Sequence, residues 1–77
     1  MDLFQLETFM AVAEEKSFSR AAVKLHRTQP AISQVIRKLE VEMDEVLFDR
    51  AARDATLTAA GELLREYAQR LLNLRGE

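Results

Sequence analysis

Two short amphipathic segments of this chain are separated by only three residues, and that spacing limits how they can pack. In the first segment, apolar residues recur at i, i+3, i+4 and i+7, the spacing of one helix face; they are Phe18, Ala21, Ala22 and Leu25. The second segment continues the pattern beyond residues 26–28, with apolar positions at Ile32, Val35, Ile36, Leu39 and Met43. Because so short a connection forces two helices to cross at a steep angle, the sequence predicts a helix-turn-helix.

The second of these helices begins close to the only proline of the chain. Residues 27–40 read RTQPAISQVIRKLE, and either Thr28 or Gln29 is expected to cap the helix. Pro30 then lies in the first turn, where its missing N–H loses no hydrogen bond. At about 100° per residue, the arc farthest from the apolar stripe carries Pro30, Gln34 and Arg37, with Ser33 and Gln29 on one flank. The helix therefore presents amides and a cation away from its core.

Residues on either side of this pair predict another helix, a ribbon and a last helix. Asp2 and Gln5 resemble a capping box at the start of a helix over roughly 3–15, and Ser17 is expected to cap the next one. Residues 46–48 and 56–57 predict a short two-stranded ribbon, which makes the motif winged. Met10 and Met43 are expected in the core.

The last helix is expected to run from its cap, Thr58, to about residue 74. Its apolar positions step by four and three, which is the spacing of a coiled-coil seam and predicts dimerisation. These positions are Ala60, Leu64, Tyr67, Leu71 and Leu74.

Charge is distributed unevenly along the 77 residues, whose formal net charge is −2. Residues 16–39 carry six basic and no acidic residues, whereas 1–15 carry four acidic and no basic residues. Residues 40–49 carry five acidic residues and are expected to face solvent, with Glu40 as a candidate partner for an arginine. A local field of one sign matters more to a polyanion than the total charge, so the basic zone favours a nucleic-acid partner.

Composition excludes several other classes of protein. With no cysteine and a single histidine, the chain offers no disulfide framework, no thiolate metal site and no histidine-rich metal site. No apolar stretch approaches the roughly 18 residues that cross a bilayer, so no membrane contact is expected. An enzyme is the weakest hypothesis, because the sequence lacks paired carboxylates, a nucleophile with its base, and phosphate-cradling glycines.

A winged helix-turn-helix places its second motif helix in the major groove of DNA. The amides of Gln29 and Gln34 can pair with adenine edges, Ser33 can bond several bases, and Pro30 can contact a thymine methyl. Arg53, at the ribbon tip, is placed to enter an adjacent minor groove. The expected phosphate contacts are Ser17, Arg20, Lys24, Arg27, Thr28, Arg37, Lys38 and Arg50.

The stretch FMAVAEEKSFSRAAVKLHRTQPAISQVIRKLE, followed by LFDR and LTAAG, resembles the N-terminal DNA-binding domain of the LysR-type transcriptional regulators. The resemblance covers residues 3 to about 67. It implies a mainly α-helical, bacterial and cytoplasmic protein that dimerises through its last helix. Its partner would be double-stranded DNA that carries an imperfect, A·T-rich inverted repeat. By the same resemblance, the base contacts are Gln29, Pro30, Ser33, Gln34 and the wing residue Arg53.

The resemblance also divides the chain into a DNA-binding domain at 1–58 and a linker or dimerisation helix at 59–77. Members of this family bind small-molecule effectors in a C-terminal domain, which is absent from these residues. No cofactor is therefore expected here, and we interpret the chain as an excised domain or a naturally short relative.

The chain departs from the family pattern at three places. Asp44 stands where the family usually has glycine after the third helix, and aspartate tolerates the left-handed conformation there at a cost of about 1 kcal/mol. The wing lacks its usual glycine, and Asp54 puts an acid beside Arg53. Gln34 stands where many relatives have arginine, which is expected to weaken phosphate attraction or change the preferred base.

A small protein-interaction module is the competing hypothesis. In it, the last helix pairs with a partner helix and the basic zone only solubilises the domain. The heptad spacing supports this hypothesis as well as it supports a DNA-binding dimer. The salt dependence of DNA binding distinguishes the two hypotheses. For a DNA-binding protein, the logarithm of the affinity for duplex DNA falls with the logarithm of the salt concentration, with a slope of about −0.9 per phosphate contact.

Overall fold

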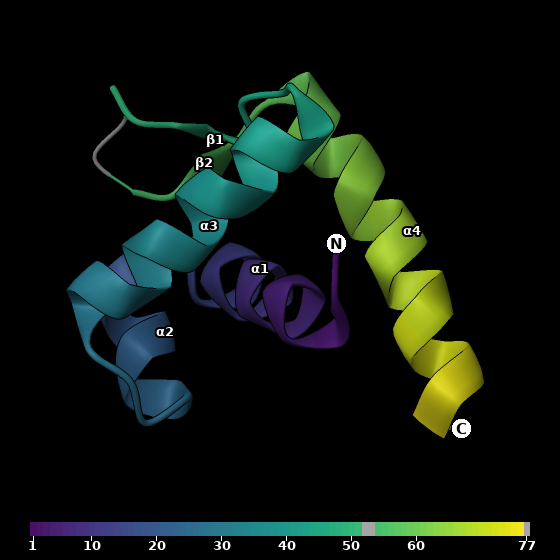
Figure 1. Cartoon of the computed structure of the whole chain (residues 1–77), viewed down its shortest axis with the longest axis horizontal. Helices are drawn as coiled ribbons and strands as arrows, with labels where there is room; N and C mark the ends of the chain where they lie inside the picture. The colour runs from purple at the N-terminus through teal and green to yellow at the C-terminus, as the bar shows by residue number, and fades with distance from the viewer. Residues whose placement is uncertain (52–53, 77) are drawn as a thin grey trace.

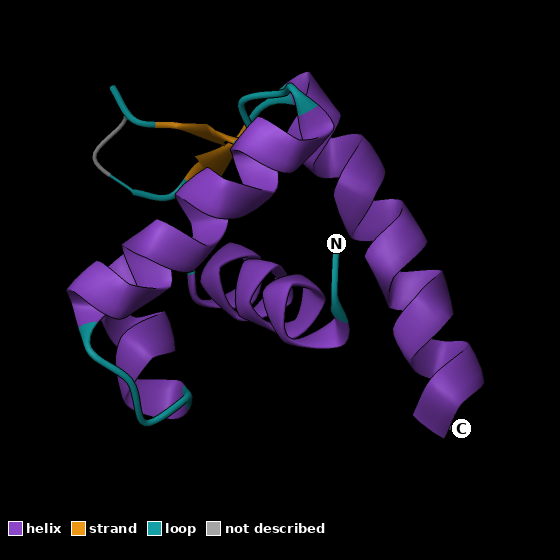
Figure 2. Cartoon of the chain, in the orientation of Figure 1, coloured by secondary structure: helices purple, strands orange, loops and turns teal. Residues whose placement is uncertain are grey.

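A computed structural model, which describes residues 1–51 and 54–76, has a helical domain with a small antiparallel ribbon (Figure 1). In chain order, the elements of the described residues are α1 (Leu3–Glu15), α2 (Phe18–Lys24), α3 (Gln29–Met43), β1 (Phe48–Asp49), β2 (Thr56–Leu57) and α4 (Ala59–Gly76). Figure 2 shows the two strands as a short projection beside α3. The predicted fold, a winged helix-turn-helix that is mainly α-helical, is confirmed.

The helices begin at the capping residues that the sequence predicted. Asp2 Oδ1 accepts from the backbone N–H of Gln5 at 2.7 Å, and Gln5 Oε1 accepts from the N–H of Asp2 at 2.9 Å, which completes the capping box. The hydroxyl oxygens of Ser17 and Thr28 accept from the N–H three residues on, at 3.0 and 3.3 Å. Thr58 Oγ1 accepts likewise at 3.1 Å. Each start is thus fixed by a local hydrogen bond.

Among the described residues, three other than glycine adopt a left-handed backbone where the chain changes direction. Lys16 ends α1 with a φ of 54°, and Asp44 ends α3 with a φ of 55°. His26, with a φ of 59°, lies in the turn between α2 and α3, as expected for a turn residue. Asp44 therefore takes the conformation predicted for it, in place of a glycine.

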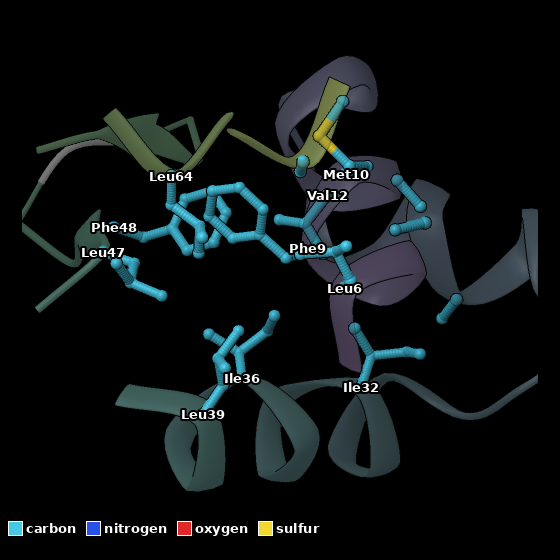
Figure 3. Packing of buried hydrophobic residues seen from close by; sticks show 14 residues of the cluster. Leu6, Phe9, Met10, Val12, Ile32, Ile36, Leu39, Leu47, Phe48 and Leu64 are labelled. Carbon is cyan, nitrogen blue, oxygen red and sulfur yellow. The ribbon is translucent and has the colours of Figure 1, made fainter. Parts of the chain in front are cut away.

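The core lies between α1, α3 and the base of the ribbon (Figure 3). The ring of Phe48 packs between two other rings, with its centroid 5.4 Å from that of Phe9 and 5.4 Å from that of Phe18. The fully buried residues of α3 are Ile32, Ile36 and Leu39. Met10 is buried as predicted, but the prediction for Met43 is wrong, because α3 ends there and leaves the side chain 37 % exposed.

The first strand of the ribbon begins two residues later than predicted, whereas the second strand lies at the predicted residues 56–57. Phe48 pairs with Leu57 and Asp49 with Thr56, whereas Val46 lies outside the strand and is exposed. The reason is Thr58, whose hydroxyl donates to the carbonyl of Val46 at 2.6 Å. This bond ties the segment before β1 to the start of α4 instead of to a ribbon partner.

Helix α4 packs against the core with its first half, where Leu64 and Ala68 are buried. Its C-terminal end projects away from the other helices (Figure 1). At Gly61 the helix passes so close to the ribbon that an added Cβ would lie 2.2 Å from the carbonyl oxygen of Leu47. The absence of a side chain at Gly61 therefore allows α4 to begin where it does.

Candidate nucleic-acid interface

The first two turns of α3 present polar side chains to solvent. Gln29, Pro30 and Gln34 are exposed, while Ile32 and Ile36 on the opposite side are fully buried. The predicted arrangement, an apolar stripe facing the core and an open polar face, is therefore confirmed for these residues. Within the described chain, this face remains free to contact another molecule.

Gln29 and Ser33 are joined by a hydrogen bond along this face. Nε2 of Gln29 donates to Oγ of Ser33 at 2.8 Å. Ser33 is only 8 % exposed, although the helical spacing placed it on the flank of the open arc. Its hydroxyl thus contacts Gln29 and presents little surface of its own.

A groove of about 230 Å³ separates the start of α3 from the ribbon. Gln29, Ser33 and Arg37 line it from the helix, and Arg50 and Asp54 line it from the ribbon side. The polar face of α3 and the ribbon are therefore neighbours, which suits them to contact adjacent parts of one ligand.

Three of the predicted phosphate-binding cations already have partners on α1. Arg20 donates through Nη2 to the carbonyl oxygen of Glu15, and Lys24 Nζ lies 3.4 Å from Glu14 Oε1. The guanidinium of Arg27 lies over the ring of Phe4, 4.8 Å from its centroid. Because exposed ion pairs contribute only about 0–1 kcal/mol, Arg20 and Lys24 can exchange these partners for another anion at little cost.

Arg37 and Lys38 differ from those cations. Both are exposed on α3, and among the residues that the structure describes neither takes part in an ion pair. Their charge is therefore not neutralised locally.

Glu40 connects α3 to the ribbon through both of its carboxylate oxygens. Oε2 accepts from the backbone N–H groups of Leu47 and Phe48 at 2.8 and 3.4 Å. Oε1 accepts from Arg50 Nη2 at 3.1 Å, and the Arg50 guanidinium lies 5.1 Å from the centroid of the Phe18 ring. The sequence indicated an arginine partner for Glu40, but gave no signal for the two backbone bonds.

The predicted wing residue Arg53 lies outside the described residues, so its role stays a prediction. The return of the ribbon is anchored, because the N–H of Ala55 donates to the carbonyl of Lys16 at 3.2 Å. The wing thus has contacts with both α1 and α3.

Ser17 and Thr28, two other predicted phosphate contacts, act as N-caps and retain their hydroxyl protons as donors.

The exposed apolar stripe of α4 shares Tyr67, Leu71 and Leu74 with the predicted seam but includes Leu63 in place of Leu64. Leu64 is only 5 % exposed and packs in the core of its own chain, so its assignment to the dimer seam is corrected. Ala60 is partly buried, while Tyr67, Leu71 and Leu74 are exposed as a dimer seam requires. Leu63 is 57 % exposed and lies on the same side as Tyr67 and Leu71, four residues apart. The exposed stripe is Leu63, Tyr67, Leu71 and Leu74.

The described residues contain neither a membrane-spanning helix nor a cluster of metal-ligating side chains. No helix there combines the length and apolar character needed to cross a membrane. The same residues bring together no group of three or more potential metal-ligating side chains among His, Cys, Asp and Glu.

Comparison of the sequence with known proteins gives matches over almost its whole length. The family model described as bacterial regulatory helix-turn-helix protein, lysR family, matches residues 3–62. An uncharacterized HTH-type transcriptional regulator of Azotobacter vinelandii is 49% identical over 74 residues, which are 96% of this chain and 51% of that protein. The regulator ShiR of Corynebacterium glutamicum is 48% identical over 90% of this chain and 23% of its own length. The chain thus spans about half of the first relative and about a quarter of the second.

Solved structures match the fold equally well. The BenM DNA-binding domain in complex with catB site 1 DNA superposes with a TM-score of 0.92 at 41% identity, over 95% of this chain and 81% of that one. The CbnR DNA-binding domain in complex with DNA superposes with a TM-score of 0.92 at 42% identity, over 99% of this chain and 87% of that one. Full-length CbnR with its target DNA superposes with a TM-score of 0.90 at 41% identity, over 99% of this chain and 25% of that one.

Proposed function

The chain belongs to the LysR family of bacterial regulatory helix-turn-helix proteins, and from this premise we propose that it binds specific sequences of double-stranded DNA as part of a transcriptional regulator. The observation that carries the proposal is the open polar face at the start of α3, opposite the buried Ile32 and Ile36. The BenM and CbnR domains, which share this fold, are bound to DNA in their structures. In this proposal, the role of the present chain is to bind DNA and not to catalyse a reaction.

In this proposal, α3 enters the major groove with its N-terminal end toward the base edges. The amides of Gln29 and Gln34 pair with adenines, and Pro30 contacts a thymine methyl. Arg53 enters the neighbouring minor groove from the wing, which the Glu40 contacts hold close to α3.

Phosphate contacts surround this base-reading set. Arg37 and Lys38 supply charge that no acid of the described chain neutralises. Ser17 and Thr28 donate hydroxyl protons, and Arg50 uses the guanidinium N–H groups that Glu40 leaves free. Arg20, Lys24 and Arg27 complete the set from α2 and the turn after it.

A homodimer through α4 fits the exposed apolar stripe of that helix, and its two recognition helices would bind an A·T-rich inverted repeat. We assign residues 1–58 to DNA binding and 59–77 to dimerisation. A small-molecule effector would bind outside these residues, since the relatives named above are about two to four times as long. The bacterial cytoplasm is the compartment where such a regulator acts.

Binding-site selection from random duplexes, followed by a salt titration, tests the proposal. Fluorescence anisotropy should give selective binding whose log affinity falls with log salt by about 0.9 per phosphate contact. Gln29→Ala should reduce discrimination at one base pair by about 1–3 kcal/mol. A protein-interaction module would enrich no sequence and would bind duplex, if at all, without selectivity. That result would replace the present proposal.

A further inference from the structure

The last turn of α1 carries two acids at a place where a helix favours cations. Glu14 and Glu15 are the final residues of α1, and that turn contains no basic residue. The carbonyl end of a helix bears a partial negative charge, so acidic side chains there are unfavourable by themselves. Two carboxylates at this position need cations from another element to offset their charge, and α2 supplies these cations.

Arg20 and Lys24 of α2 contact both acids. Nε of Arg20 lies 3.6 Å from Oε1 of Glu15, and Nη2 of the same guanidinium donates to the carbonyl oxygen of Glu15. Nζ of Lys24 lies 3.4 Å from Oε1 of Glu14 and 3.8 Å from Oε2 of Glu15. The two basic side chains remain accessible, with 65 % of Arg20 and 50 % of Lys24 exposed. Another anion can therefore reach both cations and compete for them.

The cations of α3 are in a different electrostatic state. Arg37 and Lys38 are exposed and form no ion pair within the part of the chain that the structure describes. Both helices belong to the basic zone of residues 16–39, where the sequence alone makes all the cations equivalent. The structure separates two cations that are ready to bind phosphates from two that must first leave a carboxylate.

We propose that Glu14 and Glu15 compete with DNA phosphates for Arg20 and Lys24, and so limit the part of the DNA affinity that is independent of base sequence. The inference rests on the proposed DNA-binding function and deepens it, since it names residues that set the strength of backbone binding. In a helix-turn-helix, the helix before the recognition helix crosses the DNA backbone, which brings the cations of α2 to the phosphates.

Two physical effects make such an exchanged contact weaker than one by Arg37. The cation gains only the difference between a phosphate and a carboxylate partner, because it had already lost part of its hydration and freedom to the acid. The freed carboxylate then lies near a polyanion, where it repels the phosphates and attracts a salt cation. That uptake offsets part of the counterion release, so the contact also contributes less to the salt slope.

Neutral substitutions of nearly the same shape test the competition by fluorescence anisotropy. The variant Glu14→Gln/Glu15→Gln should bind a random-sequence duplex about 2–5-fold more tightly than the wild type, as expected for exposed ion pairs. Its salt slope should be steeper, by at most about 0.9 for each of the two cations released. The control variant, Glu45→Gln/Glu66→Gln, removes two exposed acids elsewhere with the same change in net charge. It should raise the affinity less and leave the slope unchanged.

A cycle with the two cations separates local competition from a general effect of charge. In a protein that carries Arg20→Gln and Lys24→Gln, the substitutions of Glu14 and Glu15 should raise the affinity no more than the control substitutions do. Thermal unfolding verifies that every variant is folded.

Three outcomes overturn the proposal: a glutamate variant that binds no more tightly than the control, a salt slope no steeper than that of the control, or a gain that persists without the two cations. Each leaves the proposed function intact when the wild type enriches one sequence from random duplexes. A wild type that binds duplexes but enriches no sequence overturns the proposed function, while the affinities for random duplex still decide the competition. A wild type that binds no duplex overturns both.

Discussion

Glu40 makes three hydrogen bonds between α3 and residues 47–50, which contain β1. Its side chain is only 14 % exposed, and the two backbone N–H groups that it accepts from belong to fully buried residues, Leu47 and Phe48. Buried N–H groups need a partner, because an unsatisfied one costs about 1–3 kcal/mol. The carboxylate therefore fixes where β1 begins, and Arg50 adds a charged contact on the solvent side.

Replacing Glu40 by alanine should lower the free energy of unfolding by about 1–3 kcal/mol, because the N–H groups of Leu47 and Phe48 lose their acceptor. Urea denaturation measures the change. Glu45→Ala is the control, since Glu45 is an exposed acid of the same segment, and it should stay within about 0.5 kcal/mol of the wild type. Equal effects of the two substitutions would mean that Glu40 does not hold the ribbon.

Arg37 is the exposed cation of α3 whose loss should affect DNA binding with least effect on the fold. Arg37→Ala should weaken binding to all duplexes alike and lower the salt slope by about one, since one phosphate contact disappears. Stability should change by less than about 0.5 kcal/mol. Anisotropy titrations at several salt concentrations measure this, with Arg65→Ala on α4 as the control. An unchanged slope would remove Arg37 from the phosphate contacts.

Ser33 illustrates the limit of sequence reasoning for a single residue. A wheel of about 100° per residue correctly separates Gln34 and Arg37 from the buried Ile32 and Ile36. The helical wheel cannot predict whether a residue at the edge of the polar face is buried or exposed, because that depends on which other parts of the chain cover it. At Ser33 the Gln29 side chain binds the hydroxyl, and Arg50 and Ala55, which are distant in sequence, line the opposite side of the same groove.

Among the elements, helix starts were predictable and the ribbon was less so. Asp2, Ser17 and Thr28 bind N–H groups three residues away, so a short stretch of sequence contains the whole signal. The position of β1 depends on Glu40 and Thr58, which are seven or more residues from the segments they hold. Pattern alone therefore placed the start of the first strand at Val46, two residues too early.

Gly61 determines how α4 meets the ribbon. A Cβ there would lie 2.2 Å from the carbonyl oxygen of Leu47 and 2.8 Å from Cδ2 of Leu57. Since the first contact is with backbone, α4 and the ribbon would have to separate. Gly61→Ala should therefore destabilise the domain by about 1–3 kcal/mol, although alanine favours a helix by about 1 kcal/mol over glycine. Chemical denaturation measures this, and a neutral or stabilising result would contradict the close approach.

The approach of α4 also explains why Leu63 replaces Leu64 in the exposed stripe. Leu63 and Leu64 both satisfy a helical spacing with Tyr67 and Leu71, so the sequence cannot tell which leucine faces the core. The choice follows from the angle at which α4 leaves Gly61, and the structure buries Leu64. At the scale of the whole molecule, this leaves the stripe formed by Leu63, Tyr67, Leu71 and Leu74 without cover from its own chain.

Leu71→Asp tests whether a second copy covers that stripe. The substitution puts a charge where an apolar seam would close, so the wild type should sediment as a dimer and the variant as a monomer. Because Leu71 is 50 % exposed, the fold of each protomer should be retained. Gln69→Asp, on the opposite side of α4, is the matched control and should still dimerise.

The same variant should separate affinity for an inverted repeat from affinity for a half-site. Two linked recognition helices gain about 100-fold or more over one through effective concentration, and the monomeric variant forfeits that gain. Its affinity for a duplex with a single half-site should stay close to that of the wild type, because α3 and the wing are untouched. Anisotropy on the two duplexes measures both quantities. If Leu71→Asp remained dimeric, or weakened half-site binding as much as repeat binding, α4 would not be the element that joins two protomers on DNA.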